Sequence, residues 1–178
     1  MKNTWRWLFI IVTMVYPGYS FIVFGSEVGN RFVDFSLEDL HEIRYSQANL
    51  EGKITLVVLQ SRTTLQTAID CKIQLKKQIQ ENQKIQMIAI MDLRKRPSLV
   101  PKFALKSKIS AQDPTSKEIP FLLDWDVAVT KVLGGEDDKC KILIVDPALK
   151  VIYKQEYKKA AVDNEIKPWL AELSSGQK

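Results

Sequence analysis

Two continuous apolar segments, separated by a stretch of helix length, constrain the fold of this chain more than any other feature. Residues 52–60 read GKITLVVLQ and residues 85–93 read IQMIAIMDL. Runs of this kind are typical of strands buried on both faces of a sheet. Residues 63–82 between them place their apolar side chains on one broad face, as an amphipathic helix does. Strand, helix and strand of this length predict a right-handed parallel crossover in an α/β fold.

The flanking segments predict further strands and helices. Residues 31–45 hold two short alternating stretches, which indicate a small hairpin. Residues 141–146 and 150–154 predict a strand pair, joined by the turn-forming residues Asp146-Pro147-Ala148-Leu149. The remaining expected elements are a short helix over residues 98–106 bracketed by Pro97 and Pro101, a short strand before a turn at residues 124–126, a loop at Gly134-Gly135 and a last helix over residues 162–173.

Residues 1–25 have the parts of a secretory signal peptide: a short basic start, an apolar stretch and a helix break at Pro17-Gly18. Small residues suitable for cleavage stand at Ser20 and Gly25. The alternatives are an uncleaved anchor, because residues 8–24 are largely apolar, and a buried first helix. We therefore expect one periplasmic or secreted domain over residues 26–178, anchored to the membrane if the signal is not cleaved.

The charge of the chain argues against a nucleic-acid partner. Without Lys2 and Arg6 of the signal segment, 24 basic and 21 acidic side chains remain, a net charge of +3, which is too mild for that function. Six basic side chains do cluster, and they could contact a membrane or another anionic envelope component, as could the N-terminal segment. A solvated loop and helix face is the plainer interpretation. The six are Arg94, Lys95, Arg96, Lys102, Lys106 and Lys108.

The chain holds two cysteines, Cys71 and Cys140. In an oxidising compartment this even count is compatible with one disulfide, provided that the two Cα atoms lie within about 7 Å. Cys71 is otherwise a buried core residue, and Cys140 is a candidate reactive thiol because Lys139 and Lys141 would lower its pKa. The disulfide, the inert core residue and the reactive thiol all remain open at this stage.

No cofactor and no metal site is expected. The acidic residues between positions 124 and 138 match no calcium loop, and turn chemistry explains Asp124 and Asp126 without a metal. His41 is the single histidine, so zinc has no evident ligand set.

The order of these elements resembles the thioredoxin fold with the extra elements of its redoxin branch. Residues 48–61, ANLEGKITLVVLQS, are similar to the segment before the active site of exported redoxins. Residues 119–134, IPFLLDWDVAVTKVLG, resemble their strand, turn and short hydrophobic segment, and residues 140–154, CKILIVDPALKVIYK, their final hairpin. The likeness spans residues 32–173. Within this branch the chain most resembles the YtfJ family of bacterial periplasmic proteins, through Ser61-Arg62-Thr63-Thr64.

This resemblance implies a thioredoxin-like fold, with a central mixed sheet, helices on both faces and an N-terminal hairpin extension. It also implies that Thr64 and Thr67 stand where redoxins carry their dithiol. A threonine hydroxyl cannot replace a thiolate in disulfide exchange, so we expect Thr63 or Thr64 to cap the helix instead. The family's cis-proline position is held by Cys140, preceded by Lys139.

These features predict a non-catalytic binding or accessory module of the bacterial envelope, whose partner is an unidentified envelope protein or peptide. Its groove would lie between residues 62–67 and 136–141. The alternative is a thiol-dependent oxidoreductase that uses Cys140, with Cys71 resolving. A membrane-tethered assembly factor is a third interpretation, if the signal stays in place. The expected groove residues are Arg62, Thr63, Thr64, Thr67, Lys139 and Cys140.

Overall fold

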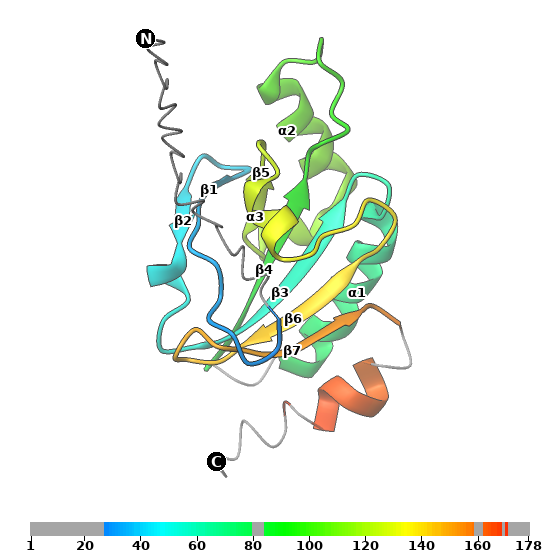
Figure 1. The fold of residues 1–178 in the computed structure, drawn as a ribbon. Coiled ribbons are helices and arrows are strands. Elements are labelled where there is room, and N and C mark those ends of the chain that lie inside the picture. The colour runs from blue at the N-terminus through cyan, green and yellow to red at the C-terminus, as the bar shows by residue number, and fades with distance from the viewer. Residues whose placement is uncertain (1–26, 80–83, 159–161, 169, 171–178) are drawn as a thin grey trace, which may run out of the picture.

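The computed structural model describes residues 27–79, 84–158, 162–168 and 170. Its centre is a mixed seven-stranded sheet with the strand order β2-β1-β5-β4-β3-β6-β7 (Figure 1). The strands are β1 (Ser36–Asp39), β2 (Arg44–Ser46), β3 (Ile54–Ser61), β4 (Ile85–Asp92), β5 (Phe121–Asp124), β6 (Lys141–Val145) and β7 (Val151–Glu156).

Strand β3 is the middle of this sheet, and all eight of its residues are buried. It pairs in parallel with β4 along its whole length and antiparallel with β6 on its other side. Helix α1 (Leu65–Ile79) makes the crossover from β3 to β4. The strand, helix and parallel strand predicted from the sequence are therefore confirmed. The helix begins at Leu65 rather than at residue 63 because the residues after β3 form a separate hydrogen-bonded turn.

The hairpin predicted near the N-terminus is also confirmed, and it extends the sheet. β1 pairs antiparallel with β2 and, on its other side, with β5. The carboxylate of Asp39 accepts the amides of His41 and Ile43 at 2.8 and 2.9 Å, which closes the hairpin turn. The second predicted hairpin is β6–β7, where Asp146 accepts the amides of Ala148 and Lys150 in the same way.

Helix α2 (Lys102–Gln112) corrects the prediction of a helix over residues 98–106. Pro101 precedes the helix with an extended backbone, φ −57° and ψ 145°. A proline inside the predicted helix would have removed a backbone donor, and it disfavours the helical conformation of the residue before it. The helix therefore starts after Pro101 and ends at Gln112. The next residue, Asp113, caps the short 3₁₀ turn η2 (Pro114–Lys117).

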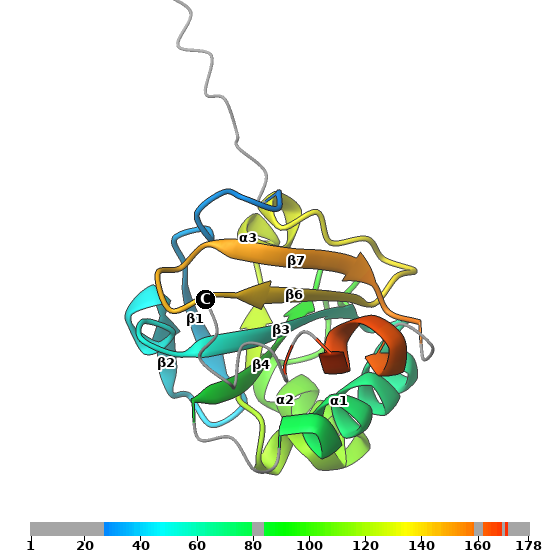
Figure 2. The same cartoon turned by 90° about the horizontal axis from the view of Figure 1, so that it is seen from below.

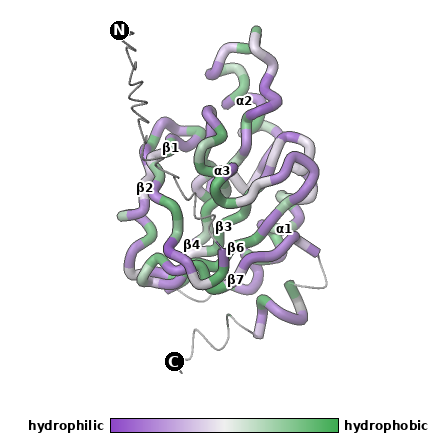
Figure 3. The backbone as a smooth tube through the Cα atoms, in the orientation of Figure 1, coloured by the Kyte–Doolittle hydropathy of each residue, from purple (hydrophilic) through white to green (hydrophobic). Residues whose placement is uncertain are grey.

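The chain packs two hydrophobic cores, one on each face of the sheet. Leu56 and Val58 of β3 face α1, α2 and the C-terminal helical turn, whereas Val57 and Leu59 face α3 (Ala128–Val132) and the N-terminal segment. Figure 2 shows α1 and the C-terminal turn together beneath the sheet, and Figure 3 shows the hydrophobic residues gathered in the central strands. This confirms helices on both faces.

The predicted last helix is described only in part. Residues 162–166 form a π-helical turn, and Val162, Ile166 and Leu170 are buried against the first core. Residues 167, 168 and 170 are also helical. Residues 169 and 171–173 of the predicted helix, and the signal segment at residues 1–25, lie outside the described residues. Within the described part of the chain, no helix has both the length and the apolar character that a membrane span requires.

A buried ion pair joins helix α1 to the start of η2. Lys72 and Asp113 are both fully buried and paired, and the ammonium group of Lys72 lies 4.8 Å from the ring centre of Phe121. Burial lowers the pKa of Lys72, while the hydrogen bond to Asp113 opposes that shift. Asp113 also accepts the amide of Thr115 at 2.9 Å. Each partner is therefore stable in the interior only because the other is present.

We expect Lys72→Met to lower the free energy of unfolding by about 3–5 kcal/mol, because it leaves the carboxylate of Asp113 buried without its counter-charge. The double variant Lys72→Met/Asp113→Asn should recover most of that loss, since asparagine keeps the cap and carries no charge. Urea denaturation of the three proteins measures both effects. A double variant as unstable as the single one would contradict this account.

Candidate functional site

The carboxyl ends of three neighbouring parallel strands meet at one edge of the sheet. Strand register aligns Ser61 at the end of β3 with Asp92 at the end of β4, and Asp92 with Asp124 at the end of β5. All three side chains are buried. In open α/β sheets this edge, with the loops that follow it, is where ligands bind. It is therefore the place at which to look for a functional site.

The turn after β3 is closed by a reciprocal pair of hydroxyl contacts. The Ser61 hydroxyl accepts the amides of Thr63 and Thr64 at 3.2 and 3.3 Å, and the Thr64 hydroxyl accepts the amide of Ser61 at 2.9 Å. This is the logic of a capping box. Helix capping by Thr63 or Thr64 stays a prediction, because the amide that the Thr64 hydroxyl accepts is that of Ser61, in the turn that precedes α1.

The loop before β6 lies against this turn, so the two arms of the predicted groove do come together. The Ser61 hydroxyl donates to the carbonyl of Asp137 at 2.5 Å, and the Thr63 hydroxyl donates to the same oxygen. We call these contacts the hydroxyl clasp. They occupy the position at which a groove between the arms was expected, so Thr64 and Cys140 are buried rather than available to a ligand.

The other expected groove residues remain at the surface. Thr63 and Thr67 are exposed, and Arg62 and Lys139 are partly exposed. The guanidinium of Arg62 donates to the carbonyl of Lys95 at 2.9 Å, and Lys139 pairs with Glu136 at 2.7 Å.

A network of charged side chains beside the clasp was missed by sequence reasoning. The carboxylate of Asp137 pairs with Lys95 at 2.7 Å and with Arg94 at 3.5 Å, and the Nε of Arg94 donates to Asp92 at 2.6 Å. This last hydrogen bond raises the pKa of Arg94. The Thr130 hydroxyl lies 2.9 Å from Asp124 and 3.5 Å from Asp92. One feature of the sequence points to this network: the apolar strands IAIMD and FLLD both end in aspartate.

The two cysteines are free and buried, and they do not lie at disulfide distance. Of the three alternatives that the sequence leaves open, the Cys71–Cys140 disulfide is therefore not formed in this structure, and the interpretation of Cys71 as a buried core residue is confirmed. Cys71 has an exposed fraction of 0% and Cys140 of 3%. Burial raises the pKa of the Cys71 thiol well above its usual range, and a hydrogen bond with Cys140 raises it further. The thiols thus contact each other in a medium that keeps Cys71 protonated.

The two lysines expected to activate Cys140 are engaged elsewhere. Lys139 and Lys141 pair with opposite oxygens of Glu136 at 2.7 and 2.5 Å. Hydrogen bonds from these lysines lower the pKa of Glu136 to about 2. Lys141 also donates to the carbonyl of Gly134 at 2.6 Å. Both cations therefore fix the loop rather than act on the sulfur.

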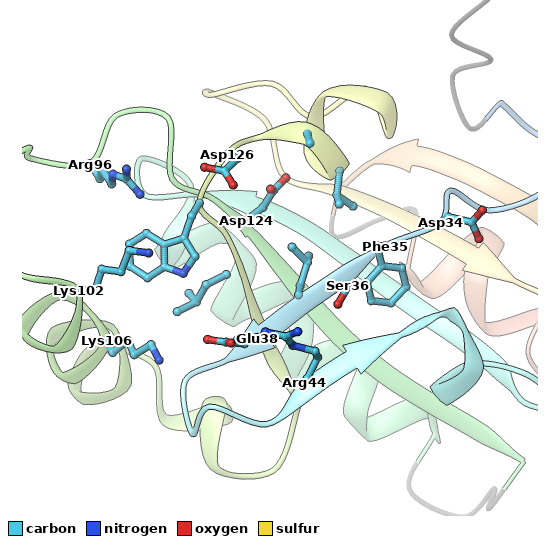
Figure 4. A pocket seen from close by; sticks show the side chains of 15 residues that line it. Asp34, Phe35, Ser36, Glu38, Arg44, Arg96, Lys102, Lys106, Asp124 and Asp126 are labelled. Atoms are coloured by element: carbon cyan, nitrogen blue, oxygen red, sulfur yellow. Dashed lines mark hydrogen bonds and ion pairs between the residues drawn. The ribbon is translucent and has the colours of Figure 1, made fainter.

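A separate pocket of about 490 Å³ lies between the β1–β2 hairpin, the start of α2 and the segment after β5. Figure 4 shows Arg96, Lys102 and Lys106 at one end and Asp34 and Phe35 at the other. Arg96 and Lys102 stand over the ring of Trp125, with 5.2 and 4.9 Å to the ring centre. The pKa of Glu38 in this pocket is lowered, first by its hydrogen bond with Arg44. Among the described residues no group of three His, Cys, Asp or Glu could hold a metal ion.

Comparison of sequences identifies no relative: no protein-family model matches the chain, and no curated protein does. Comparison of structures does find relatives. A protein described as the thiol:disulfide interchange protein DsbE of Chlorobium tepidum superposes with a TM-score of 0.63, at 16% identity over 83% of this chain and 98% of that one. The protein has a thioredoxin-like fold.

Two further structures of this fold are similar to the chain. The exposed lipoprotein thioredoxin of Streptococcus pneumoniae has a TM-score of 0.59, with 14% identity over 76% of this chain and 99% of that one. An uncharacterised conserved protein of Geobacillus kaustophilus has a TM-score of 0.65, with 16% identity over 85% and 84% of the two chains. At such identities the likeness concerns the fold, so activity has to be argued from the site.

We expect Ser61→Ala to lower the free energy of unfolding by about 1–2 kcal/mol, because it removes an amide acceptor at the helix start and one half of the hydroxyl clasp. Thr67→Ala is the matched control, since it deletes an exposed hydroxyl on the helix that follows the turn and should change the value by less than about 0.5 kcal/mol. Chemical denaturation measures both. Equal effects of the two changes would show that the clasp contributes nothing specific to stability.

Proposed function

We propose that this protein is a non-catalytic binding or accessory module of the bacterial envelope, built on a thioredoxin-like fold. The observation that carries the proposal is the hydroxyl clasp, which joins the β3–α1 turn to the loop before β6 through Ser61, Thr63 and the carbonyl of Asp137. In the redoxin likeness, this turn is where a dithiol would act.

The state of the two thiols supports the same interpretation. Disulfide exchange and peroxide reduction both need an accessible thiolate. Cys71 is fully buried with a raised pKa, and Cys140 is buried in the same hydrophobic core. No accessible thiol is therefore available at the surface of the described residues.

The proposed contact surface consists of the solvent-facing side chains around the clasp. Arg62, Thr63 and Thr67 line one side and Lys139 the other. Together they offer hydroxyl groups and cations, which suit the carbonyls and carboxylates of an envelope protein or peptide. The clasp holds both sides in a fixed relation, so the surface is organised before a partner arrives.

Three observations support the compartment. Residues 1–25 carry the pattern of a signal peptide, the Ser61-Arg62-Thr63-Thr64 sequence resembles the YtfJ family of periplasmic proteins, and the similar thioredoxin of Streptococcus pneumoniae is named an exposed lipoprotein. We propose on this basis a periplasmic or secreted protein, with a membrane anchor if the signal stays in place.

One observation favours a second candidate, a thiol oxidoreductase using Cys140 and Cys71. The two side chains are hydrogen-bonded to each other although 69 positions separate them in sequence. Such a function would require the loop that carries Asp137 to leave the turn, so that Cys140 becomes accessible. The Cys140 thiolate would then attack a substrate disulfide and release one substrate thiol. Cys71 would attack the mixed disulfide, release the second substrate thiol and form a Cys71–Cys140 bond, for which the two cysteines would have to move closer together.

Thiol reactivity separates the two candidates. We expect the native protein to form no adduct with a thiol-alkylating reagent, the denatured protein to form two, and neither state to reduce insulin disulfides. Intact-mass spectrometry and the insulin turbidity assay measure this, with Cys140→Ser as the matched variant. Insulin reduction by the wild type that is lost in Cys140→Ser would replace the binding module with the oxidoreductase.

Partner binding has its own test. We expect a photo-crosslinking amino acid at Thr67, in cells that export the protein, to yield a discrete adduct of higher mass. The same group at Val28, which is exposed on another segment, should yield none. The variant Arg62→Gln/Lys139→Gln should reduce the Thr67 adduct several-fold. Equal labelling from positions 67 and 28 would contradict a contact surface around the clasp.

A further inference from the structure

An apolar tip stands at the end of the molecule between β4 and α2. Leu99 has an exposed fraction of 95% and Phe103 of 75%, and Val100 between them is also exposed. Scattered surface hydrophobic residues need no explanation, but three within five positions form a contiguous patch. We call Leu99, Val100 and Phe103 the β4–α2 tip. Figure 1 shows this segment and α2 at the top of the molecule, beyond the end of the sheet.

The tip has a defined backbone. The amide of Val100 donates to the carbonyl of Pro97 at 3.2 Å, which closes a turn, and the amide of Leu105 donates to the carbonyl of Pro101 at 3.1 Å in the first turn of α2. Proline fixes the backbone angle φ at positions 97 and 101. The apolar side chains are therefore held outward, and little ordering is needed when they bind.

Cations surround this tip. Residues 94–108 contain six basic side chains and no acidic one. Arg94 and Lys95 pair with Asp137, and Lys106 pairs with Glu42 at 3.2 Å. The other three, Arg96, Lys102 and Lys108, have no carboxylate partner within the part of the chain that the structure describes. Two of these stand over Trp125, which holds them near the base of the tip.

We propose that the β4–α2 tip docks the protein on a bilayer that contains anionic phospholipid. An apolar tip with cations behind it matches the layers of such an interface, where phosphate groups lie outside the acyl chains. An acidic soluble protein would satisfy the cations, but it would need a groove of its own to cover a convex tip. Leu99, Val100 and Phe103 enter the acyl boundary, and Arg96, Lys102 and Lys108 meet the phosphates.

A local fluorescence probe tests this docking in the full chain, so that whatever residues 1–25 contribute is common to every variant. Leu99→Cys is labelled with an environment-sensitive fluorophore, and the buried Cys71 and Cys140 leave the native protein otherwise unlabelled. Wild-type protein carried through the same labelling gives the background. The matched control is Ile73→Cys, an exposed apolar position on α1, far in sequence from residues 1–25.

We expect vesicles that contain phosphatidylglycerol to shift the emission of the Leu99 probe to the blue, and vesicles of phosphatidylcholine alone to have a much smaller effect. The Ile73 probe should not respond. Adding Arg96→Gln/Lys102→Gln/Lys108→Gln should raise the half-saturating lipid concentration about a hundredfold, at about fivefold per cation. Phe103→Ser should raise it about tenfold, and added salt should weaken all binding through the cations.

Three outcomes would overturn the proposal: no shift with anionic vesicles, an equal shift with phosphatidylcholine, or an equal shift at position 73. A shift on addition of polyglutamate, without one on vesicles, would also overturn it and assign the surface to an acidic protein. Because none of these readouts involves the thiols or the hydroxyl clasp, the result is independent of the proposed function.

Discussion

Burial of β3 on both faces and along both edges is the constraint on which the rest of this structure depends. A strand with every residue buried needs hydrogen-bonding partners on each side, which β4 and β6 provide, and apolar layers above and below. Its alternating side chains supply both hydrophobic cores. Its length and register also decide which residue reaches the edge of the sheet, namely Ser61, and which residues stand beside it, namely Asp92 and Asp124.

The chemistry of that edge follows from satisfying polar groups that the register buries. The Ser61 hydroxyl accepts the amides of Thr63 and Thr64 in the turn before α1, and it donates to the carbonyl of Asp137 in the loop before β6. Asp92 and Asp124 would repel each other as buried carboxylates, but Arg94 neutralises the first and Thr130 donates to the second through its amide and its hydroxyl. A thioredoxin-like scaffold thus carries at this edge a set of buried polar groups, each of which has a hydrogen-bonding partner.

What the sequence predicts well here is local, and what it misses depends on distant residues. The crossover, the hairpins and the turns follow from periodicity and turn chemistry within a few positions, as at Asp146. Helix α2 was placed too early because Pro97 and Pro101 can each precede a helix, and Pro101 is the one that does so. Nothing local distinguishes Lys72 from the exposed lysines of its helix, since Asp113 lies 41 positions away. For the same reason, the charged network around Asp137 could not be anticipated.

The hydroxyl clasp has a consequence for how the protein matures. A turn fastened by cysteines would form only after an oxidant, a disulfide catalyst and the correct pairing had all been supplied. Serine and threonine need none of these, and their contacts are unaffected by changes in the redox potential of the surroundings. The chain can therefore complete this part of its fold wherever water and the peptide backbone are the only reagents, and in reducing surroundings as readily as in oxidising ones.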